Sequence, residues 1–429
     1  MSAQEDWLIS EERMETDHLF IGGGPAGVFA ALTAARSGGK CIILEQNESI
    51  GRKLRITGKG RCNLTNNCGT DTLIAKIPRN GRFLYSAFSR CSPQDVMEYF
   101  ESLGVPLKTE RGNRVFPVSD RAADIAEALK KALKKAGIPV IRGKVKRLCL
   151  ENGRCTGAVT ADGKIYRAKN VLLATGGASY PATGSTGDGY RFAQEAGHTL
   201  VPPVPSLIPL EAEEDWCAEA PGLTLKNVRL RILEKNKCRF DEQGELMLMA
   251  YGLSGPLTLS ASTLLKDPVP GKYTAEIDLK PALSVQQLDQ RFLREFSDAP
   301  NEALGQILRR LLPAQLIAPV CTLCSIPPDT RGHSITKIQR SALVGQLKKM
   351  TLHITGTRPL AEAIVTRGGI PVKEIDARTM ASKIMPGLYF AGEIIDADGF
   401  TGGFNLQIAF STAYSAGLAM AQEAADDTD

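Results

Sequence analysis

Residues 19–27 read Leu-Phe-Ile-Gly-Gly-Gly-Pro-Ala-Gly, an apolar segment that runs directly into a G-x-G-x-x-G motif. Gly22 permits a tight turn, Gly24 lets the backbone approach a pyrophosphate, and Gly27 lets a helix pack closely on the strand. A helix expected from Pro25 to residue 38 would point its N-terminal N–H groups and the positive end of its dipole at that pyrophosphate. The stretch therefore predicts the first turn of a dinucleotide-binding α/β domain.

A second apolar segment, residues 41–44, ends at Glu45, eighteen residues after Gly27. An acid at about this distance closes the first βαβ unit of a dinucleotide-binding domain. Glu45 is expected to accept hydrogen bonds from the ribose hydroxyls of the adenosine half of the ligand. A glycine-rich turn without a ligand is the alternative, but strand, helix, second strand and acid in register favour dinucleotide binding.

The composition is that of an ordinary globular protein. The 429 residues are 43% hydrophobic and 23% charged, with a net charge of +5, and a chain of this length is expected to form two domains. No apolar stretch reaches the ~20 residues that span a bilayer, and residues 1–15 lack the apolar core of a secretory signal. We therefore expect a cytoplasmic protein with no membrane partner.

A local basic run lies at residues 130–135, where four lysines share the polar face of an expected helix. The apolar face of that helix includes Ile125, Leu129 and Leu133. A solvated helix face explains the run better than a nucleic-acid site does, so nucleic acid is not an expected partner. The expected partner is a small-molecule substrate, and the sequence leaves the oligomeric state open.

Ten cysteines are scattered through the chain, which indicates reduced thiols rather than a disulfide framework. Cys321 and Cys324 have the C-x-x-C spacing of a redox or metal motif. No second pair and no neighbouring histidine completes a zinc site, so we expect no metal. Packing is the favoured interpretation of the pair over redox chemistry.

The order of the segments indicates a domain that is split in the sequence. The composition changes after residue 198, where several prolines occur, and an apolar strand returns at residues 387–391 before a helix expected over 405–421. An insert in the middle of a dinucleotide domain explains this order. We predict a flexible extension at 1–16, a dinucleotide domain at 17–198 and 346–421, a substrate-side insert at 199–345 and a tail at 422–429.

The returning strand favours FAD over NAD. An NAD domain normally continues with further βαβ units soon after Glu45, whereas here a distant strand ends in Ala-Gly-Glu at residues 391–393. A helix follows, and its N–H groups between Gly403 and Leu406 would stabilise negative charge on the N1 and C2=O side of a reduced flavin. The topology therefore predicts an FAD site.

Three blocks carry a resemblance to a known family: GRKLRITGKGRCNLTN at 51–66, ATGGASYPATGSTGDG at 174–189, and residues 387–407. They closely resemble the BaiN-like family of bacterial FAD-dependent oxidoreductases, a group that includes aminoacetone oxidase-like proteins, and the resemblance covers about residues 17–421. It implies a Rossmann-like FAD-binding α/β domain, split in sequence, with an inserted α+β domain that contains a β-barrel and faces the flavin.

The resemblance also implies the residues that bind the cofactor. They are Gly22, Gly24, Pro25, Ala26, Gly27, Glu45, Arg52, Lys53, Asn63, Thr65, Val145 (through its backbone), Thr175, Gly176, Gly392, Glu393, Gly403, Asn405, Leu406, Gln407 and Ile408. One departure is visible: many relatives have Thr-His where this chain has Met249-Ala250. A role of that histidine in relatives does not carry over, which weakens any assignment of substrate.

Four side chains are candidates for catalysis. Asn63 is the best candidate for a polar contact near flavin N5 and O4, where a donor would assist hydride transfer. Arg61 holds substrate or flavin, or else braces its loop. Cys62 lacks a resolving partner, so packing is favoured over redox chemistry. Tyr180 either lines the substrate pocket or sits in a rigid turn.

We therefore predict an FAD-dependent oxidoreductase that transfers hydride through flavin N5 to or from a small organic substrate. NAD(P)H would act at most as a transient donor, because no second G-x-G-x-x-G follows a strand. An amine or amino-ketone oxidase that releases peroxide is one alternative. A non-catalytic FAD-binding redox sensor and an RNA-modifying flavoenzyme are two others.

Overall fold

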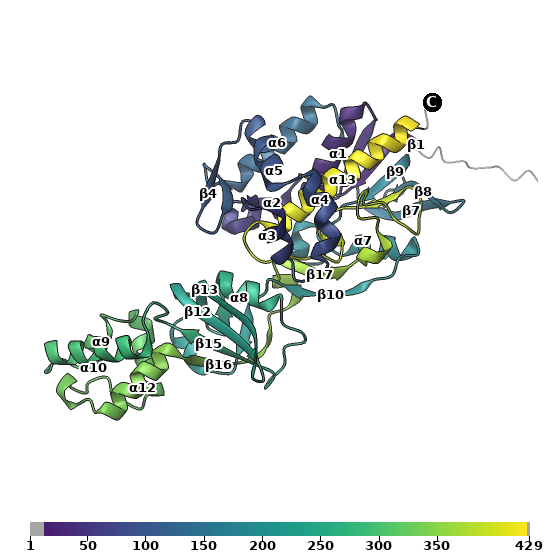
Figure 1. The fold of residues 1–429 in the computed structure, drawn as a ribbon. Coiled ribbons are helices and arrows are strands. Elements are labelled where there is room, and N and C mark those ends of the chain that lie inside the picture. The colour runs from purple at the N-terminus through teal and green to yellow at the C-terminus, as the bar shows by residue number, and fades with distance from the viewer. Residues whose placement is uncertain (1–12, 427–429) are drawn as a thin grey trace, which may run out of the picture. The chain divides into compact units, whose positions relative to one another are not determined.

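The computed structural model describes residues 13–426. The chain folds as two compact units (Figure 1). Unit 1 is formed by the residues up to Ser206 and from Leu360 onward, and unit 2 by Leu207–Pro359.

Unit 1 is built on a seven-stranded sheet with the order β6-β2-β1-β9-β8-β7, in which β18 also pairs with β9. The neighbours β6-β2-β1-β9-β18 are parallel, whereas β7 and β8 are antiparallel. Buried apolar side chains explain the parallel core, since parallel strands are covered on both faces. The strands are β1 (Arg13–Ile21), β2 (Cys41–Glu45), β6 (Val140–Arg142), β7 (Val145–Glu151), β8 (Arg154–Thr160), β9 (Ile165–Leu173) and β18 (Leu388–Phe390).

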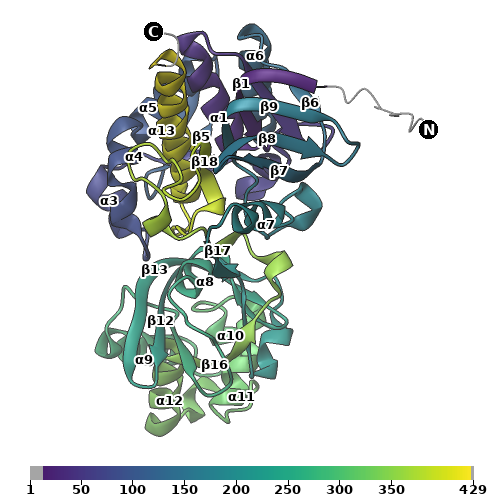
Figure 2. The same cartoon turned by 90° about the vertical axis from the view of Figure 1, so that its right-hand side faces the viewer.

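Two helices that are far apart in the sequence pack together in unit 1, α1 and α13 (Figure 2). The Phe29 and Phe410 rings meet edge to face at 5.2 Å, which is a favourable aromatic geometry. The helices of the unit are α1 (Pro25–Ala34), α2 (Arg52–Ile56), α3 (Thr70–Ala75), α4 (Tyr85–Arg90), α5 (Pro93–Ser102), α6 (Ala122–Lys135), α7 (Asp188–Glu195) and α13 (Phe404–Asp426). Two smaller sheets complete it: β3 (Thr65–Asn66), β5 (Arg114–Pro117) and β4 (Leu107–Glu110), and the pair β10 (Val201–Ser206) and β17 (Val365–Gly369).

Unit 2 is a closed six-stranded barrel with a helical segment inserted between its last two strands. The barrel order is β11 (Leu210–Ala212), β14 (Gly252–Ser254), β13 (Lys237–Met249), β12 (Thr224–Glu234), β15 (Tyr273–Asp278) and β16 (Met350–Thr357). Helix α8 (Gly255–Ser262) follows β14, and α9 (Val285–Asp298), α10 (Leu304–Leu308), α11 (Ile317–Leu323) and α12 (Lys337–Lys348) separate β15 from β16.

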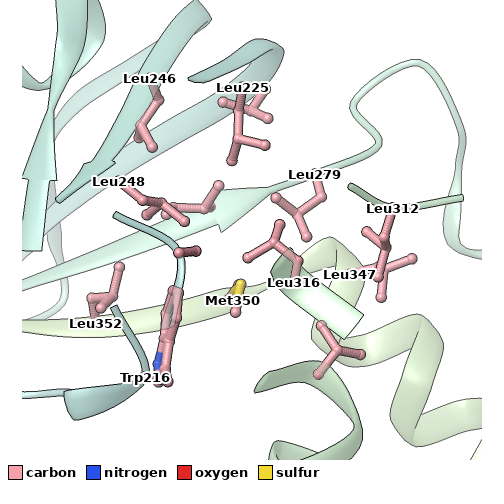
Figure 3. Close-up of a cluster of buried hydrophobic side chains, with 14 of the residues drawn as sticks. Trp216, Leu225, Leu246, Leu248, Leu279, Leu312, Leu316, Leu347, Met350 and Leu352 are labelled. Atoms are coloured by element: carbon pink, nitrogen blue, oxygen red, sulfur yellow. The ribbon is translucent and has the colours of Figure 1, made fainter. Parts of the chain in front are cut away.

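One continuous core joins the barrel of unit 2 to its helices. Leu248 and Met350 from the strands lie in the same buried cluster as Leu316 and Leu347 from the helical segment (Figure 3). The barrel and the helices therefore share one hydrophobic core.

Several predicted boundaries are wrong. Residues 13–16 belong to β1 and not to an extension, because they pair with β9, while residues 1–12 lie outside the described residues. The insert begins after Ser206 rather than at 199, because β10 pairs with β17 of unit 1. It ends at Pro359 rather than 345, because β16 closes the barrel against β15 and β11.

The predicted tail at 422–429 is also wrong in its first part. Helix α13 continues to Asp426, five residues beyond the expected end, and residues 427–429 lie outside the described part. Among residues 13–426, no helix is both long and apolar enough to cross a membrane.

Candidate functional site in unit 1

The three motif glycines have different surroundings at the carboxyl end of β1. A side chain at Gly22 would overlap the Ala174 carbonyl, and one at Gly27 would overlap the Gly22 carbonyl, so both positions require glycine for backbone packing. A Cβ at Gly24 would meet no heavy atom within 4 Å. Of the three, Gly24 alone therefore faces open space, which is where the fingerprint places a pyrophosphate.

Helix α1 begins at this opening. Gly24 is its N-cap residue, Pro25 occupies the first turn, and no side chain caps the helix. The N–H groups of the first turn, at Ala26 and Gly27, lack the i−4 carbonyl partners of a helix interior. An uncapped helix start beside an open space is suited to an anion.

Glu45 lies at the end of β2 and is 7% exposed. Its Oε2 accepts from Gly23 N at 2.6 Å, and its Oε1 accepts from Asn47 N at 2.8 Å. The carboxylate thus fastens the glycine turn to the loop after β2. Asn47 Nδ2 also donates to Oε1 at 2.6 Å. A carboxylate offers about four lone-pair sites, so about one is left for a ribose hydroxyl.

The side chains of Arg52 and Lys53 have different surroundings, although the two residues are adjacent in the sequence. Arg52 is exposed and donates to Asn47 Oδ1 at 2.8 Å. Lys53 Nζ points inward, 2.8 Å from Glu393 Oε2 and 2.7 Å from Ser179 Oγ. The structure therefore brings together two expected cofactor residues, Lys53 and Glu393, as an ion pair.

The loop of residues 58–66 is tied to the start of α13. With the Asn63 amide oriented to match its two neighbours, its nitrogen donates to Thr65 O at 3.2 Å and its oxygen accepts from Gly403 N at 3.1 Å. Thr65 Oγ1 donates to Gln407 Oε1 at 2.5 Å. Asn63 thus sits at the helix start expected to face the flavin, whereas the Gln407 side chain is fully buried and held by protein groups.

Other expected cofactor residues also have structural partners. Asn405 Oδ1 accepts from Gly399 N at 2.9 Å, which braces the glycine-rich loop before α13. Ile408 is buried at 2% exposure, and Leu406 is partly exposed. Gly392 N donates to Thr412 Oγ1 at 3.0 Å.

The segment after β9 contains an unpartnered polar atom. The Thr175 hydroxyl is buried and has no hydrogen-bond partner among the described residues. Gly176 beside it has a φ of +73°, a conformation that favours glycine. Val145 is a buried residue of β7, and its partner in the neighbouring strand is Thr160. The Thr175 hydroxyl packs against Gly189, where a Cβ would come within 1.9 Å of it, so this atom faces protein and not an open space.

The structure defines the surroundings of the catalytic candidates Arg61, Cys62 and Tyr180. Arg61 contacts Glu110 at 2.5 Å and Asp120 at 2.6 Å and stacks on Phe116, so it braces its loop. Cys62 is fully buried, and burial raises the pKa of its thiol to about 12, which opposes thiolate chemistry. Tyr180 adopts a left-handed backbone with a φ of +51° in the turn before Pro181.

Sequence reasoning missed several residues of the site. Ser179 and Thr366 both bind Glu393, through Ser179 Oγ at 3.1 Å and Thr366 N at 2.9 Å. Asp398 is fully buried and lies 2.5 Å from Arg79 Nη2, and burial raises the pKa of nearby Asp396. Ser179 and both aspartates stood inside recognised blocks, but nothing in the sequence marked Arg79 or Thr366.

The C-x-x-C pair of unit 2 is not arranged for metal binding. Cys321 is buried, Cys324 is partly buried, and burial raises the pKa of both thiols. Within residues 13–426, no group of three or more His, Cys, Asp or Glu is arranged to hold a metal ion.

The residues at the strand ends fit an FAD-type dinucleotide. Gly24 leaves space, α1 offers uncapped N–H groups, and the turn at Gly176 follows the neighbouring strand β9. These features lie at the carboxyl ends of β1 and β9, the edge at which open α/β sheets bind ligands.

Comparison with known proteins agrees with this geometry. The model of the HI0933-like protein Rossmann domain matches residues 16–419. The 3-dehydro-bile acid Δ4,6-reductase of Clostridium scindens is 33% identical over 94% of this chain and 98% of its own length. The ribosomal RNA dihydrouridine synthase of Escherichia coli is 29% identical over 93% of this chain and 96% of its own.

A solved structure shares the fold. The 3-ketosteroid Δ1-dehydrogenase of Sterolibacterium denitrificans aligns with a TM-score of 0.53 and 14% identity, over 95% of this chain and all of that chain. The chain belongs to the HI0933-like family, with a Rossmann-type FAD-binding fold, and is an enzyme of the flavin-dependent oxidoreductase class.

Proposed function

We propose that this chain saturates a carbon–carbon double bond conjugated to a carbonyl group, with FAD as its cofactor. The observation that carries the proposal is the open space at Gly24, beside the uncapped start of α1, in a chain that matches two double-bond-reducing proteins along almost their whole lengths. Bound FAD would supply hydride from flavin N5.

The names of the two relatives describe one chemistry on different substrates. A 3-oxo steroid with Δ4,6 unsaturation and the uracil ring of uridine each carry a C=C bond next to a carbonyl. Saturation adds hydride to the carbon β to the carbonyl and a proton to the α carbon, and negative charge develops on the carbonyl oxygen. A site for this reaction therefore needs a cofactor cradle and a hydrogen-bond donor at that oxygen.

The residues of unit 1 would divide the work of holding the cofactor. The first turn of α1 would bind the pyrophosphate, and Glu45 would bind the ribose. Lys53, fixed by Glu393, would hold a positive charge beside the cofactor. The first turn of α13 and the adjacent Asn63 would stabilise negative charge on the flavin ring.

NADH or NADPH is proposed as the hydride source. The sequence holds no second dinucleotide fingerprint, so the nicotinamide would bind only transiently. The substrate class follows from the reaction: a small cyclic enone or a uracil ring.

The proposal is tested by measurements of flavin absorbance made without oxygen. Purified protein should release FAD rather than FMN, be bleached by NADH or NADPH, and recover its flavin absorbance when a 3-oxo-Δ4 steroid or a uridine-containing RNA is added, with formation of the saturated product. Bleaching by small amines followed by rapid peroxide release in oxygen would replace the proposal with an amine oxidase. A flavin that no donor bleaches would replace it with a sensor.

A further inference from the structure

The helical segment of unit 2, defined here as residues 280–349, carries a net positive charge. This segment has ten Lys and Arg and five Asp and Glu, a net charge of +5. The whole chain also has a net charge of +5. The remainder of the chain has no net charge, although it includes a basic run at residues 130–147. The helical segment is thus one of the net-positive regions of the chain, and such a region attracts polyanions.

An open hollow of about 680 Å³ lies on the outer face of α9 in this segment. Gln286, Gln290 and Arg294 follow one another at four-residue spacing along its wall. The other polar residues of the lining are Lys280, Gln287, Arg291 and Arg310, and the lining contains no carboxylate. The hollow thus offers amide and cationic donors without a competing acidic group in its wall.

Two of the cations that line the hollow, Arg291 and Arg310, form ion pairs with the same acid, Glu295. Glu295 is 8% exposed in its side chain, and it binds Arg291 at 2.6 Å and Arg310 at 3.0 Å. Arg310 also binds Glu302 at 2.9 Å. These contacts fix the two guanidinium groups and leave part of each, with side-chain exposures of 44% and 39%, toward solvent.

The other two cations in the lining are Lys280 and Arg294. Neither Lys280 nor Arg294 makes an ion pair with any residue in the described range 13–426. Burial and the charge of Arg291 lower the pKa of Lys280, as expected for a cation without an acid beside it. Lys348 Nζ donates to Lys280 O at 3.0 Å and to Leu283 O at 2.6 Å, which fixes the turn that presents Lys280.

We propose that this hollow binds a phosphate group of RNA and that the helical segment is an RNA-docking surface. Ammonium, guanidinium and amide donors together suit phosphate oxygens. The spread of charge favours a polyanion over a free phosphate, because Arg309 and Lys337 are exposed cations of the same segment outside the hollow. Phosphate binding stands without any flavin chemistry, and only the choice of uracil as the reacting ring rests on the proposed function.

The experiment measures binding of the full-length, FAD-loaded protein to a labelled single-stranded RNA about 20 nucleotides long, by fluorescence anisotropy at several salt concentrations. The double variant Lys280→Gln/Arg294→Gln should weaken binding about tenfold or more and reduce the slope of log K against log salt by about 0.7 per lost contact. The matched control, Lys130→Gln/Lys131→Gln on α6, removes the same charge from exposed positions and should leave binding unchanged.

Three results would overturn the proposal: no RNA binding by the wild type at low salt, equal weakening by both double variants, or unaltered binding by the Lys280/Arg294 variant. A hollow that serves a free phosphate would show weakened binding of inorganic phosphate with RNA binding intact, which overturns the RNA assignment. FAD content and Tm report whether the variants fold. Failure of flavin reoxidation by every conjugated substrate would refute the proposed function and leave this binding result standing.

Discussion

Lys53 Nζ lies 2.8 Å from Glu393 Oε2, and this ion pair joins segments 340 residues apart in the chain. Each side chain is 20% exposed. Ser179 Oγ and Thr366 N complete the contacts of the Glu393 carboxylate. The pair therefore closes the split domain at the point where its two halves meet, beside the residues expected to hold the cofactor.

Loss of this pair should cost more than loss of an exposed one. Glu393→Gln leaves a partly buried ammonium without its counter-charge, so the free energy of unfolding of the FAD-free protein should fall by about 1–3 kcal/mol. The control is Glu127→Gln, which breaks the more exposed pair with Arg55 and should change stability by less than about 0.5 kcal/mol. Urea denaturation of both variants measures the difference, and equal effects would contradict a structural role of the Lys53–Glu393 pair.

Acid should destabilise the protein through His18. Its ring is fully buried in β1 without a hydrogen-bond partner, and burial, the largest effect, lowers its pKa below 6.5. The folded state thus binds this proton less readily than the unfolded state. The stability that neutral His18 contributes is therefore present above about pH 6.5. It is lost as the pH falls toward the pKa of His18 in the folded protein.

His18→Leu removes the titrating group without breaking a hydrogen bond. Unfolding free energies measured between pH 5 and pH 7.5 should fall less steeply in the variant, by at most about 1.4 kcal/mol per pH unit, the value for one proton. Parallel pH profiles for wild type and variant would show that His18 does not titrate in this range.

Cys62 should be unreactive and dispensable for electron transfer. Its thiol is fully buried with its pKa raised to about 12, whereas Cys238 is exposed. Iodoacetamide at pH 8 should therefore label Cys238 first and leave Cys62 unmodified in the folded protein, as peptide mass spectrometry would show. Cys62→Ala should keep its FAD and the rate of flavin reduction, and a loss of that rate with FAD retained would restore a catalytic role for the thiol.

The fingerprint was readable from the sequence because its function depends on local spacing. Gly22, Gly24 and Gly27 act within one turn, and Glu45 reaches that turn through a single strand. The returning strand at 388–390 was also readable, since an apolar run that ends in glycine has the same form wherever it occurs in a chain. Its parallel pairing with β9 places it in the same sheet.

The domain limits and much of the site were not readable because they depend on distant pairing. β10 looks like the start of an insert, since three of its six residues are proline, yet it pairs with β17, about 160 residues later. Thr366 and Arg79 acquire their partners, Glu393 and Asp398, only through the folded chain. The sequence also could not decide whether Arg61 holds a ligand or braces its loop. Its partners Glu110 and Asp120 lie outside its motif.

Substitutions at two glycines of the fingerprint should have different effects. Gly27→Ala should lower the stability of the fold, and Gly24→Ala should weaken FAD binding. A Cβ at Gly27 would overlap the Gly22 carbonyl, which is backbone and cannot move aside, so Gly27→Ala should destabilise the FAD-free protein by about 3 kcal/mol or more. Gly24 has an extended backbone with φ −76° and ψ 179°, which alanine also adopts, and its Cβ would meet no protein atom within 4 Å. Gly24→Ala should therefore change stability by less than about 1 kcal/mol.

The same methyl group at Gly24 would stand where the pyrophosphate is proposed to approach the backbone, so FAD affinity should fall about tenfold or more. Thermal unfolding of the FAD-free variants measures the first effect, and titration with FAD measures the second. Gly24→Ala thus isolates the ligand contact from the packing role that Gly27 fulfils. Undiminished FAD affinity in a stable Gly24→Ala protein would place the pyrophosphate away from the start of α1, and the assignment of the site to this strand edge would then be wrong.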